Sequence, residues 1–224
     1  MSASEILAPG VLTPPPVLTT ERLVVRPLEA PDLEPVHRLY LDIGWDVKAL
    51  SADENRERRR SWLEWTLGSY REFPRLQQPV YGERAIARRS DGAFVGLVGL
   101  VPSFGPFAQL PSLGARRHAR FSPEAGLFWA VSPAHQGQGL ATEAAGAFLA
   151  HIVATLNLAR VVATTEHDNL PSMAVMRQLG MRLETNPYPE IGPDWFQVVG
   201  IFEPEGDETG PINAPARDRT RDHR

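Results

Sequence analysis

The segment 129–145, WAVSPAHQGQGLATEAA, constrains the fold of this chain more than any other. The apolar run 127–131 predicts a buried strand, and a helical pattern begins near Ala141. Between the two, Gly137 and Gly139 allow a turn whose successive backbone N–H groups point into one concavity. The positive end of the helix dipole faces the same place. The segment therefore predicts a backbone site for a diphosphate.

The identity of that diphosphate is narrowed by residue type. No acidic side chain occurs between Ala134 and Thr142, so nothing there repels an anion. A dinucleotide-binding turn needs a third glycine where this chain has Thr142, and five residues already separate Val131 from Gly137. A Walker loop needs a Gly-Lys-Ser/Thr step, which the segment lacks. Both nucleotide-binding interpretations are disfavoured.

Composition excludes further classes. The 224 residues include no cysteine, which excludes disulfides, thiolate metal sites and an acyl-cysteine intermediate, and no metal is expected. The 23 basic and 27 acidic groups give a net charge of −4, which disfavours a nucleic-acid partner. No apolar run reaches the roughly 18 residues that span a bilayer, and the proline-rich N-terminal residues do not show the basic-then-apolar pattern expected of a signal peptide. We expect a cytoplasmic protein that does not enter the membrane.

The chain divides into one domain and two tails. Residues 1–19 are rich in proline and predict a flexible arm. Residues 203–224 are charged, contain glycine and proline, and predict a disordered tail. The folded domain is expected at 20–202.

Within the domain, the patterns alternate between strands and helices and predict a mixed α/β sheet covered by helices. Strands are expected at 23–26, 85–88, 94–101, 127–131, 161–165, near Leu183 and at 196–202. Helices are expected at 33–41, 141–157 and 171–179, and a further helix is expected to start at the capping box of Ser51. A long loop is expected at 102–123.

The six residues Gln136-Gly137-Gln138-Gly139-Leu140-Ala141 match the Gln/Arg-x-x-Gly-x-Gly/Ala pattern of the GNAT acetyltransferase superfamily. The sequence resembles this family in its flanks too, with Asn169-Leu-Pro-Ser172 before a helix that ends at Gly180. Residues 19–28 resemble the opening strand of the Rim-type branch, which acetylates ribosomal-protein N-termini. The resemblance covers about 19–202.

The resemblance implies the GNAT fold, an α/β (α+β) architecture with a mixed, mostly antiparallel sheet, splayed central parallel strands and helices on both faces. It also implies acetyl-CoA as co-substrate, held where 127–131 and 161–165 splay apart. Residues assigned to it by position are the main chain of Ala130 and Val131 for pantetheine, the amides of Gln136, Gly137, Gln138, Gly139, Leu140 and Ala141 for the pyrophosphate, the Thr142 hydroxyl, and Asn169 with Ser172 for the pantetheine arm. A plain helix cap is the alternative role for Asn169.

The chemistry implied is direct attack of an amine on a thioester in a ternary complex, since the chain offers no cysteine for a covalent relay. A backbone N–H near Val131 would stabilise the oxyanion. Glu124 is the first candidate for the base. Relatives often carry a glutamate two positions later, where this chain has Gly126, and an ordinary surface role for Glu124 is the alternative.

The proton donor to the thiolate is less defined. Relatives place a tyrosine where this chain has Met176, so Ser172 or water is expected to serve instead, unless the thiolate needs no dedicated acid. Glu190 and Asp194 are weaker candidates for the base, and His118 is a candidate to face the acceptor, with a solvated loop as the alternative. His135 lies in the predicted anion site but is expected to be an exposed loop residue, and His151 is expected to be structural.

The acceptor is a primary amine, either a protein N-terminus or a small molecule. We expect its groove near Trp45, Trp62, Trp65 and the 102–123 insertion, with core packing as the alternative. A homodimer is compatible with the closing strands. The rival function is a non-catalytic acyl-CoA-binding regulatory module.

Overall fold

The computed structural model describes residues 15–204, so most of the predicted arm and tail lies outside it. One eight-stranded sheet has the order β1-β2-β3-β4-β5-β6-β8-β7. Its strands are β1 Leu18–Thr19, β2 Leu23–Pro27, β3 Gly82–Arg88, β4 Phe94–Gly105, β5 Ser122–Val131, β6 Val161–Thr165, β7 Arg182–Thr185 and β8 Val198–Phe202. All neighbours pair antiparallel except β5 and β6, which confirms the predicted mixed sheet.

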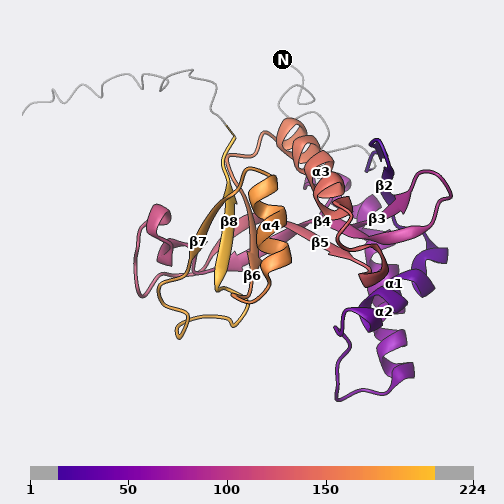
Figure 1. Ribbon diagram of the computed structural model, residues 1–224, viewed down its shortest axis with the longest axis horizontal. Helices are drawn as coiled ribbons and strands as arrows, with labels where there is room; N and C mark the ends of the chain where they lie inside the picture. The colour runs from indigo at the N-terminus through magenta and orange to yellow at the C-terminus, as the bar shows by residue number, and fades with distance from the viewer. Residues whose placement is uncertain (1–14, 205–224) are drawn as a thin grey trace, which may run out of the picture.

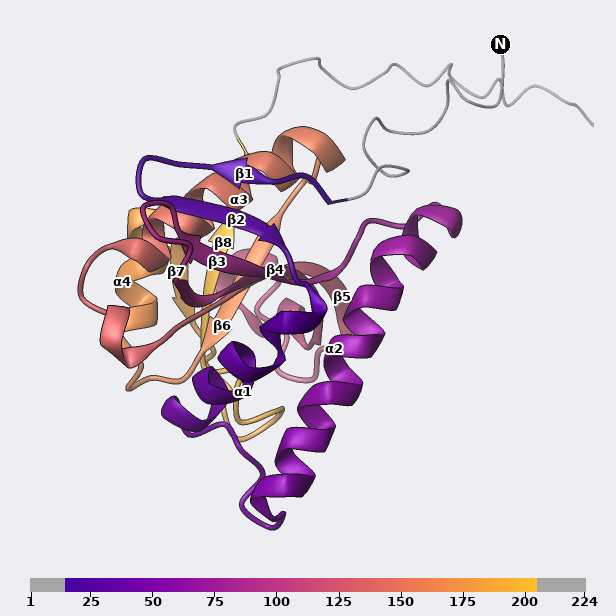
Figure 2. The ribbon, with the colours of Figure 1, turned by 90° about the vertical axis from the view of Figure 1, so that its right-hand side faces the viewer.

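Within residues 15–204, four α-helices cover both faces of the sheet, as predicted (Figures 1 and 2). Their bounds are α1 Leu33–Asp42, α2 Ala52–Arg75, α3 Leu140–Leu156 and α4 Leu170–Gln178. The core under α1 and α2 contains Leu39, Leu63 and Leu97. The core under α3 and α4 contains Phe148 and Met176. No helix within 15–204 combines the length and hydrophobicity needed to cross a membrane.

Several helices begin or end where local residue patterns predict. The Ser51 hydroxyl accepts a hydrogen bond from the Glu54 N–H at 3.2 Å, and the Glu54 carboxylate accepts one from the Ser51 N–H at 2.8 Å. This is the predicted capping box at the start of α2. Gly180 follows α4 with φ of +76°, the left-handed conformation that ends many helices.

The sheet extends beyond the prediction at two places. Leu18 and Thr19 pair with β2, so the domain begins at least two residues before the expected boundary. The predicted loop 102–123 is wrong at both ends, because β4 continues to Gly105 and β5 begins at Ser122. Beyond Leu100, β4 pairs with β5 but no longer with β3. Its other edge is open there, and such an edge tolerates a proline, here Pro102.

The two parallel strands separate soon after they meet. β5 and β6 pair only at Ala125 with Val161 and at Gly126 with Val162. From there β5 continues to Val131 and β6 to Thr165 without further pairing between them. The predicted splay is therefore confirmed. It leaves one backbone edge of 127–131 unpaired, next to the N-terminal ends of α3 and α4.

Candidate active site

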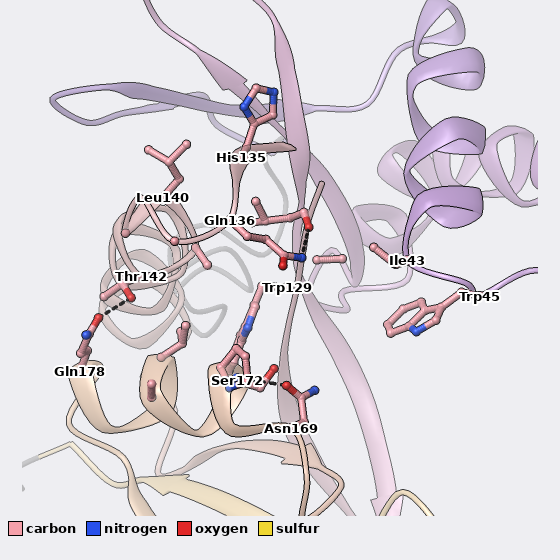
Figure 3. A pocket seen from close by; sticks show the side chains of 18 residues that line it. Ile43, Trp45, Trp129, His135, Gln136, Leu140, Thr142, Asn169, Ser172 and Gln178 are labelled. Atoms are coloured by element: carbon pink, nitrogen blue, oxygen red, sulfur yellow. Dashed lines mark hydrogen bonds between the residues drawn. The ribbon is translucent and has the colours of Figure 1, made fainter. Parts of the chain in front are cut away.

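A cavity of about 520 Å³ occupies the splay (Figure 3). Three parts of the chain form it: the end of β5 with the glycine turn and the start of α3, one side of α4 along its length, and the segment after α1. The lining residues are Ile43, Trp45, Trp129, Ala130, Val131, His135, Gln136, Gly137, Gly139, Leu140, Ala141, Thr142, Asn169, Pro171, Ser172, Ala174, Val175 and Gln178.

The glycine turn joins a short 3-10 turn, Pro133–His135, to α3. Gly137 has φ of +71° and Gly139 has φ of +74°, a region in which a side chain is strained. Gly139 is also the N-cap of α3, and no side chain caps that end. The first amides of α3 are thus left for an external acceptor, and the helix dipole favours an anionic one.

Of the residues predicted to bind the co-substrate, Gln138 is the one that does not line the cavity. Its carbonyl accepts a hydrogen bond from Arg22 Nη1 at 2.9 Å, and its side chain reaches the Ala134 carbonyl at 3.4 Å. The structure brings the other predicted residues together around one space, although they come from β5, the turn, α3 and α4. Their roles toward a ligand stay predictions.

Two predicted contacts already have partners within the protein. The Val131 carbonyl accepts a hydrogen bond from Gln136 Nε2 at 2.9 Å. A carbonyl has two lone pairs, so one remains for a pantetheine amide. The Thr142 hydroxyl donates to Gln178 Oε1 at 2.7 Å and would have to leave this partner to reach a phosphate. That contact ties the start of α3 to α4.

Asn169 caps α4, which is the alternative role weighed from the sequence, and it also lines the cavity. Its Oδ1 accepts a hydrogen bond from the Ser172 N–H at 3.2 Å, which caps α4, and both residues line the cavity. Met176, at the position of the tyrosine in relatives, is 1% exposed and packs in the core. Among the residues that the structure describes, Ser172 is the hydroxyl that α4 presents to the cavity.

Glu124 is not brought into the cavity. It lies near the start of β5, where its carboxylate accepts hydrogen bonds from Arg160 Nη2 at 2.6 Å and Arg160 Nε at 3.1 Å. The glutamate side chain is 13% exposed and the arginine side chain 29%. A role as base stays a prediction, and the ion pair supplies a structural role in any case.

The weaker catalytic candidates lie elsewhere, apart from His135, which lines the cavity. His118 and Asp194 are exposed outside it, and Glu190 pairs with Arg117 at 3.3 Å. Burial, with Arg84 nearby, lowers the pKa of His151 on α3. Among the residues described, no carboxylate lines the cavity, and no group of three or more His, Asp or Glu could hold a metal ion.

Aromatic side chains form the end of the cavity next to α1. Trp45 lines it and is 52% exposed, with its ring centroid 5.7 Å from Tyr40 and 5.9 Å from Phe128. Trp62 instead packs against the core, and Trp65 contacts Phe73. Of the three tryptophans predicted near an acceptor groove, Trp45 alone lines this cavity.

Tyr40 anchors this aromatic end. Burial raises its pKa to about 12, so its hydroxyl stays protonated at neutral pH. The guanidinium of Arg59 lies 3.4 Å from the centre of its ring, a cation–π contact that holds the α1 and α2 side chains together.

Some lining residues were missed from the sequence. Trp129 points from β5 toward Ser172 in Figure 3, and alternation along the strand could have placed it on the α4 side. Nothing local marks Ile43 or Gln178, which enter through tertiary packing. The 102–123 insertion does not line the cavity, since its Phe107 and Leu110 pack in a separate core.

The comparisons with known proteins agree with this geometry. The acetyltransferase (GNAT) domain family matches residues 22–182. The Uncharacterized N-acetyltransferase YnaD of Bacillus subtilis (strain 168) is 43% identical over 56 residues, which are 25% of this chain and 33% of that protein. The Spermidine N(1)-acetyltransferase of Escherichia coli (strain K12) is 28% identical over 163 residues, or 71% of this chain and 73% of that protein.

Among solved structures, Mycobacterium smegmatis RimJ in complex with CoA-disulfide has a TM-score of 0.58 at 20% identity, covering 85% of this chain and 88% of that one. At this identity the likeness shows a shared fold. The sequence led us to expect a Rim-type protein among the structural neighbours, and RimJ is one. The family match runs from the start of β2 to the start of β7, across the glycine turn and the splayed strands. The chain therefore belongs to the acetyltransferase (GNAT) domain family.

Proposed function

We propose that this protein transfers an acetyl group from acetyl-CoA to a primary amine by direct attack in a ternary complex. One observation carries the proposal: a single cavity joins the uncapped amides of α3, the free edge of β5 and Trp45 after α1. The first two features suit a diphosphate with an amide-containing arm. The third suits an acceptor that approaches from the opposite side of the sheet.

The residues present fit acetyl-CoA. Gly137 and Gly139 keep the turn open, and no heavy atom lies within 4 Å of where a Cβ of Gly137 would stand. The N-terminal amides of α3 would hold the diphosphate. The main chain of Ala130 and Val131 would pair with the pantetheine amides, and Asn169 would contact the arm from α4.

When bound, acetyl-CoA supplies an acetyl group activated as a thioester. The protein's part is to hold the acceptor nitrogen against that carbon, exclude bulk water and keep the sulfur near a proton donor. Ser172 is the hydroxyl that this structure offers for the last task, directly or through water. The amine forms its N–C bond as the C–S bond breaks, and it loses one proton to water or, through water, to Glu124, which lies outside the cavity lining.

The acceptor proposed is a primary amine, in one of two classes. The Escherichia coli relative is a spermidine acetyltransferase by name, and one solved structure of the same fold is by name a ribosomal-protein-S5-alanine acetyltransferase of Vibrio fischeri. The cavity lining contains no carboxylate that would select a polyamine. We therefore favour an amine whose neighbouring groups contact Trp45 and Trp129, such as a peptide N-terminus.

The test is release of free CoA thiol from acetyl-CoA with a panel of spermidine, amino acids and short N-terminal peptides. We expect amine-dependent release with at least one acceptor and a mass gain of one acetyl group on that amine. Tight CoA binding without transfer to any amine would contradict the enzymatic proposal.

A second candidate, a non-catalytic acyl-CoA-binding module, is favoured by two observations. Met176 fills the usual tyrosine position and is buried, and no carboxylate among the described residues lines the cavity. Such a protein would bind acetyl-CoA and CoA in calorimetry and leave the thioester intact in the presence of every amine tested.

A further inference from the structure

An acidic side chain stands next to the proposed diphosphate site. Glu143 is in the first turn of α3, and its N–H bonds to the Gly139 carbonyl at 3.1 Å. A free carboxylate at this end of the helix would repel a diphosphate held by the amides one turn earlier. The structure uses this carboxylate in another way.

Three donors from the turn between β1 and β2 surround the Glu143 carboxylate. Its Oε1 accepts from the Thr20 hydroxyl at 2.6 Å and from the Arg22 N–H at 2.9 Å. Its Oε2 accepts from Arg22 Nε at 2.6 Å. The Glu143 side chain is 17% exposed, and Arg22 neutralises its charge.

The pKa of Glu143 reflects this environment. Burial works to raise it, but the hydrogen bonds from Thr20 and Arg22 outweigh burial and lower it below the ordinary value of a glutamate. The carboxylate is therefore ionised at neutral pH and stays bonded to Arg22.

The same guanidinium also holds the glycine turn. Arg22 Nη1 donates to the Gln138 carbonyl at 2.9 Å, while Nε of the same group donates to Glu143. A trans peptide unit is planar, with its C=O and N–H on opposite sides. Because the Gln138 carbonyl is directed toward Arg22, the N–H of Gly139 is directed away from it, and Gly139 lines the cavity.

We propose that Arg22 is a positioning residue for the diphosphate of the co-substrate: with Glu143 as its anchor, it fixes the Gln138–Gly139 peptide so that its N–H faces the cavity. The inference rests on the proposed function, since it needs a CoA thioester in the cavity. Arg22 and Gln138 are 116 positions apart, so the contact exists only in the folded protein.

The experiment compares Arg22→Ala, Arg22→Lys and Glu143→Gln with the unaltered full chain. Affinity is measured by calorimetry for CoA and for dephospho-CoA, which keeps the diphosphate and lacks the 3′-phosphate. Turnover is measured with acetyl-CoA and with S-acetylpantetheine, which has no diphosphate. The control is Arg88→Ala, which breaks an exposed Arg88–Asp91 pair in the β3–β4 turn, outside the cavity.

For Arg22→Ala we expect both CoA and dephospho-CoA to bind about tenfold more weakly, as loss of charge-assisted hydrogen bonds at a half-exposed site predicts. The ratio of kcat/KM for acetyl-CoA to that for S-acetylpantetheine should fall by a similar factor. Arg22→Lys should lose nearly as much, because an ammonium cannot span Glu143 and Gln138 in the same planar geometry. Glu143→Gln should lose part of the affinity, and Arg88→Ala none.

Four results would overturn the inference. They are an unchanged CoA affinity in Arg22→Ala, a lysine variant that restores it, a loss for CoA that dephospho-CoA does not share, and equal losses with acetyl-CoA and S-acetylpantetheine. Glu143→Gln keeps the side-chain shape, so it tests the anchor even where Arg22→Ala lowers the melting temperature. Failure of the proposed function looks different, since the unaltered protein would then bind no CoA, or would bind CoA and transfer no acetyl group to any amine.

Discussion

The two halves of β5 behave as different structures although they are one strand. The first half is paired on both sides, with β4 and with β6 at Ala125 and Gly126. Its side chains are committed to packing and to the Glu124–Arg160 pair. The second half keeps β4 but has lost β6, and its free edge becomes the wall of the cavity.

This difference shows where a sheet protein can place a ligand. A strand edge that is already paired has no backbone groups to offer, whereas a splayed edge offers a row of them in register. The glycine turn follows the free half after the short 3-10 turn, and both line one cavity, so the proposed diphosphate site and the amide edge form one continuous surface. The predictions below alter one half of β5, or the region next to it, at a time.

The largest effect is expected at the turn after the free half. Gly139→Glu places a side chain at φ of +74° and a carboxylate beside the proposed diphosphate, so CoA affinity should fall at least about 100-fold. Calorimetry measures this. Gly92→Glu is the matched control, since Gly92 has φ of +72° and open space around its Cβ but lies outside the cavity. Unchanged CoA binding in Gly139→Glu would refute the site.

The paired half should respond in stability. A Cβ at Gly126 would crowd the Ser103 hydroxyl and come within 2.8 Å of the Val101 carbonyl, so Gly126→Ala should lower the free energy of unfolding by about 2 kcal/mol. Urea unfolding measures this. Gly68→Ala in α2 meets nothing within 4 Å and should be neutral or slightly stabilising. Equal unfolding midpoints for the two variants would show that the paired half is not crowded.

Removing an aromatic side chain at the acceptor end of the cavity is expected to change KM for the amine. Trp45→Ala removes a lining aromatic, so KM for the amine should rise about tenfold while CoA affinity stays the same. Trp65→Ala is the matched control, because Trp65 is 57% exposed against 52% for Trp45 and does not line the cavity. A change in CoA affinity with no change in KM for the amine would contradict this role, since Trp45 would then contact the co-substrate and not the acceptor.

The smallest effect separates two roles for Glu124. If Glu124 is the base, Glu124→Gln lowers kcat more at neutral than at alkaline pH, since a deprotonated amine needs no base. Loss of the ion pair by itself predicts about 1 kcal/mol of lost stability and no change in the pH profile. Arg160→Gln breaks the same pair and keeps the carboxylate, so a base role predicts the altered profile in the Glu124 variant only.

Much of the site could be predicted because its signals are local. The strand, the glycine turn and the helix that follow one another in 127–157 depend on neighbouring residues. The same holds for Asn169, whose cap on α4 is made to a residue three positions away. The order of the strands in the sheet then brings the ends of these elements together at the splay.

The roles of single side chains were harder to predict because they depend on partners far away in the chain. Glu124 meets Arg160 across 36 positions, and the buried position of Met176 depends on the core around β8. The extent of β4 depends on which neighbour it keeps, which no local pattern reveals.

From the sequence alone came the mixed sheet, the glycine turn and the family, because backbone conformation at Gly137 and Gly139 and hydrophobic periodicity are set by nearby residues. Only the tertiary structure decided which side chains reach the cavity, that Trp45 and Trp129 line it while Glu124 does not, and that Arg22 donates a hydrogen bond to the turn. Side-chain direction and long-range hydrogen bonds depend on how strands pair and where helices pack, and those partners lie tens to more than a hundred residues apart.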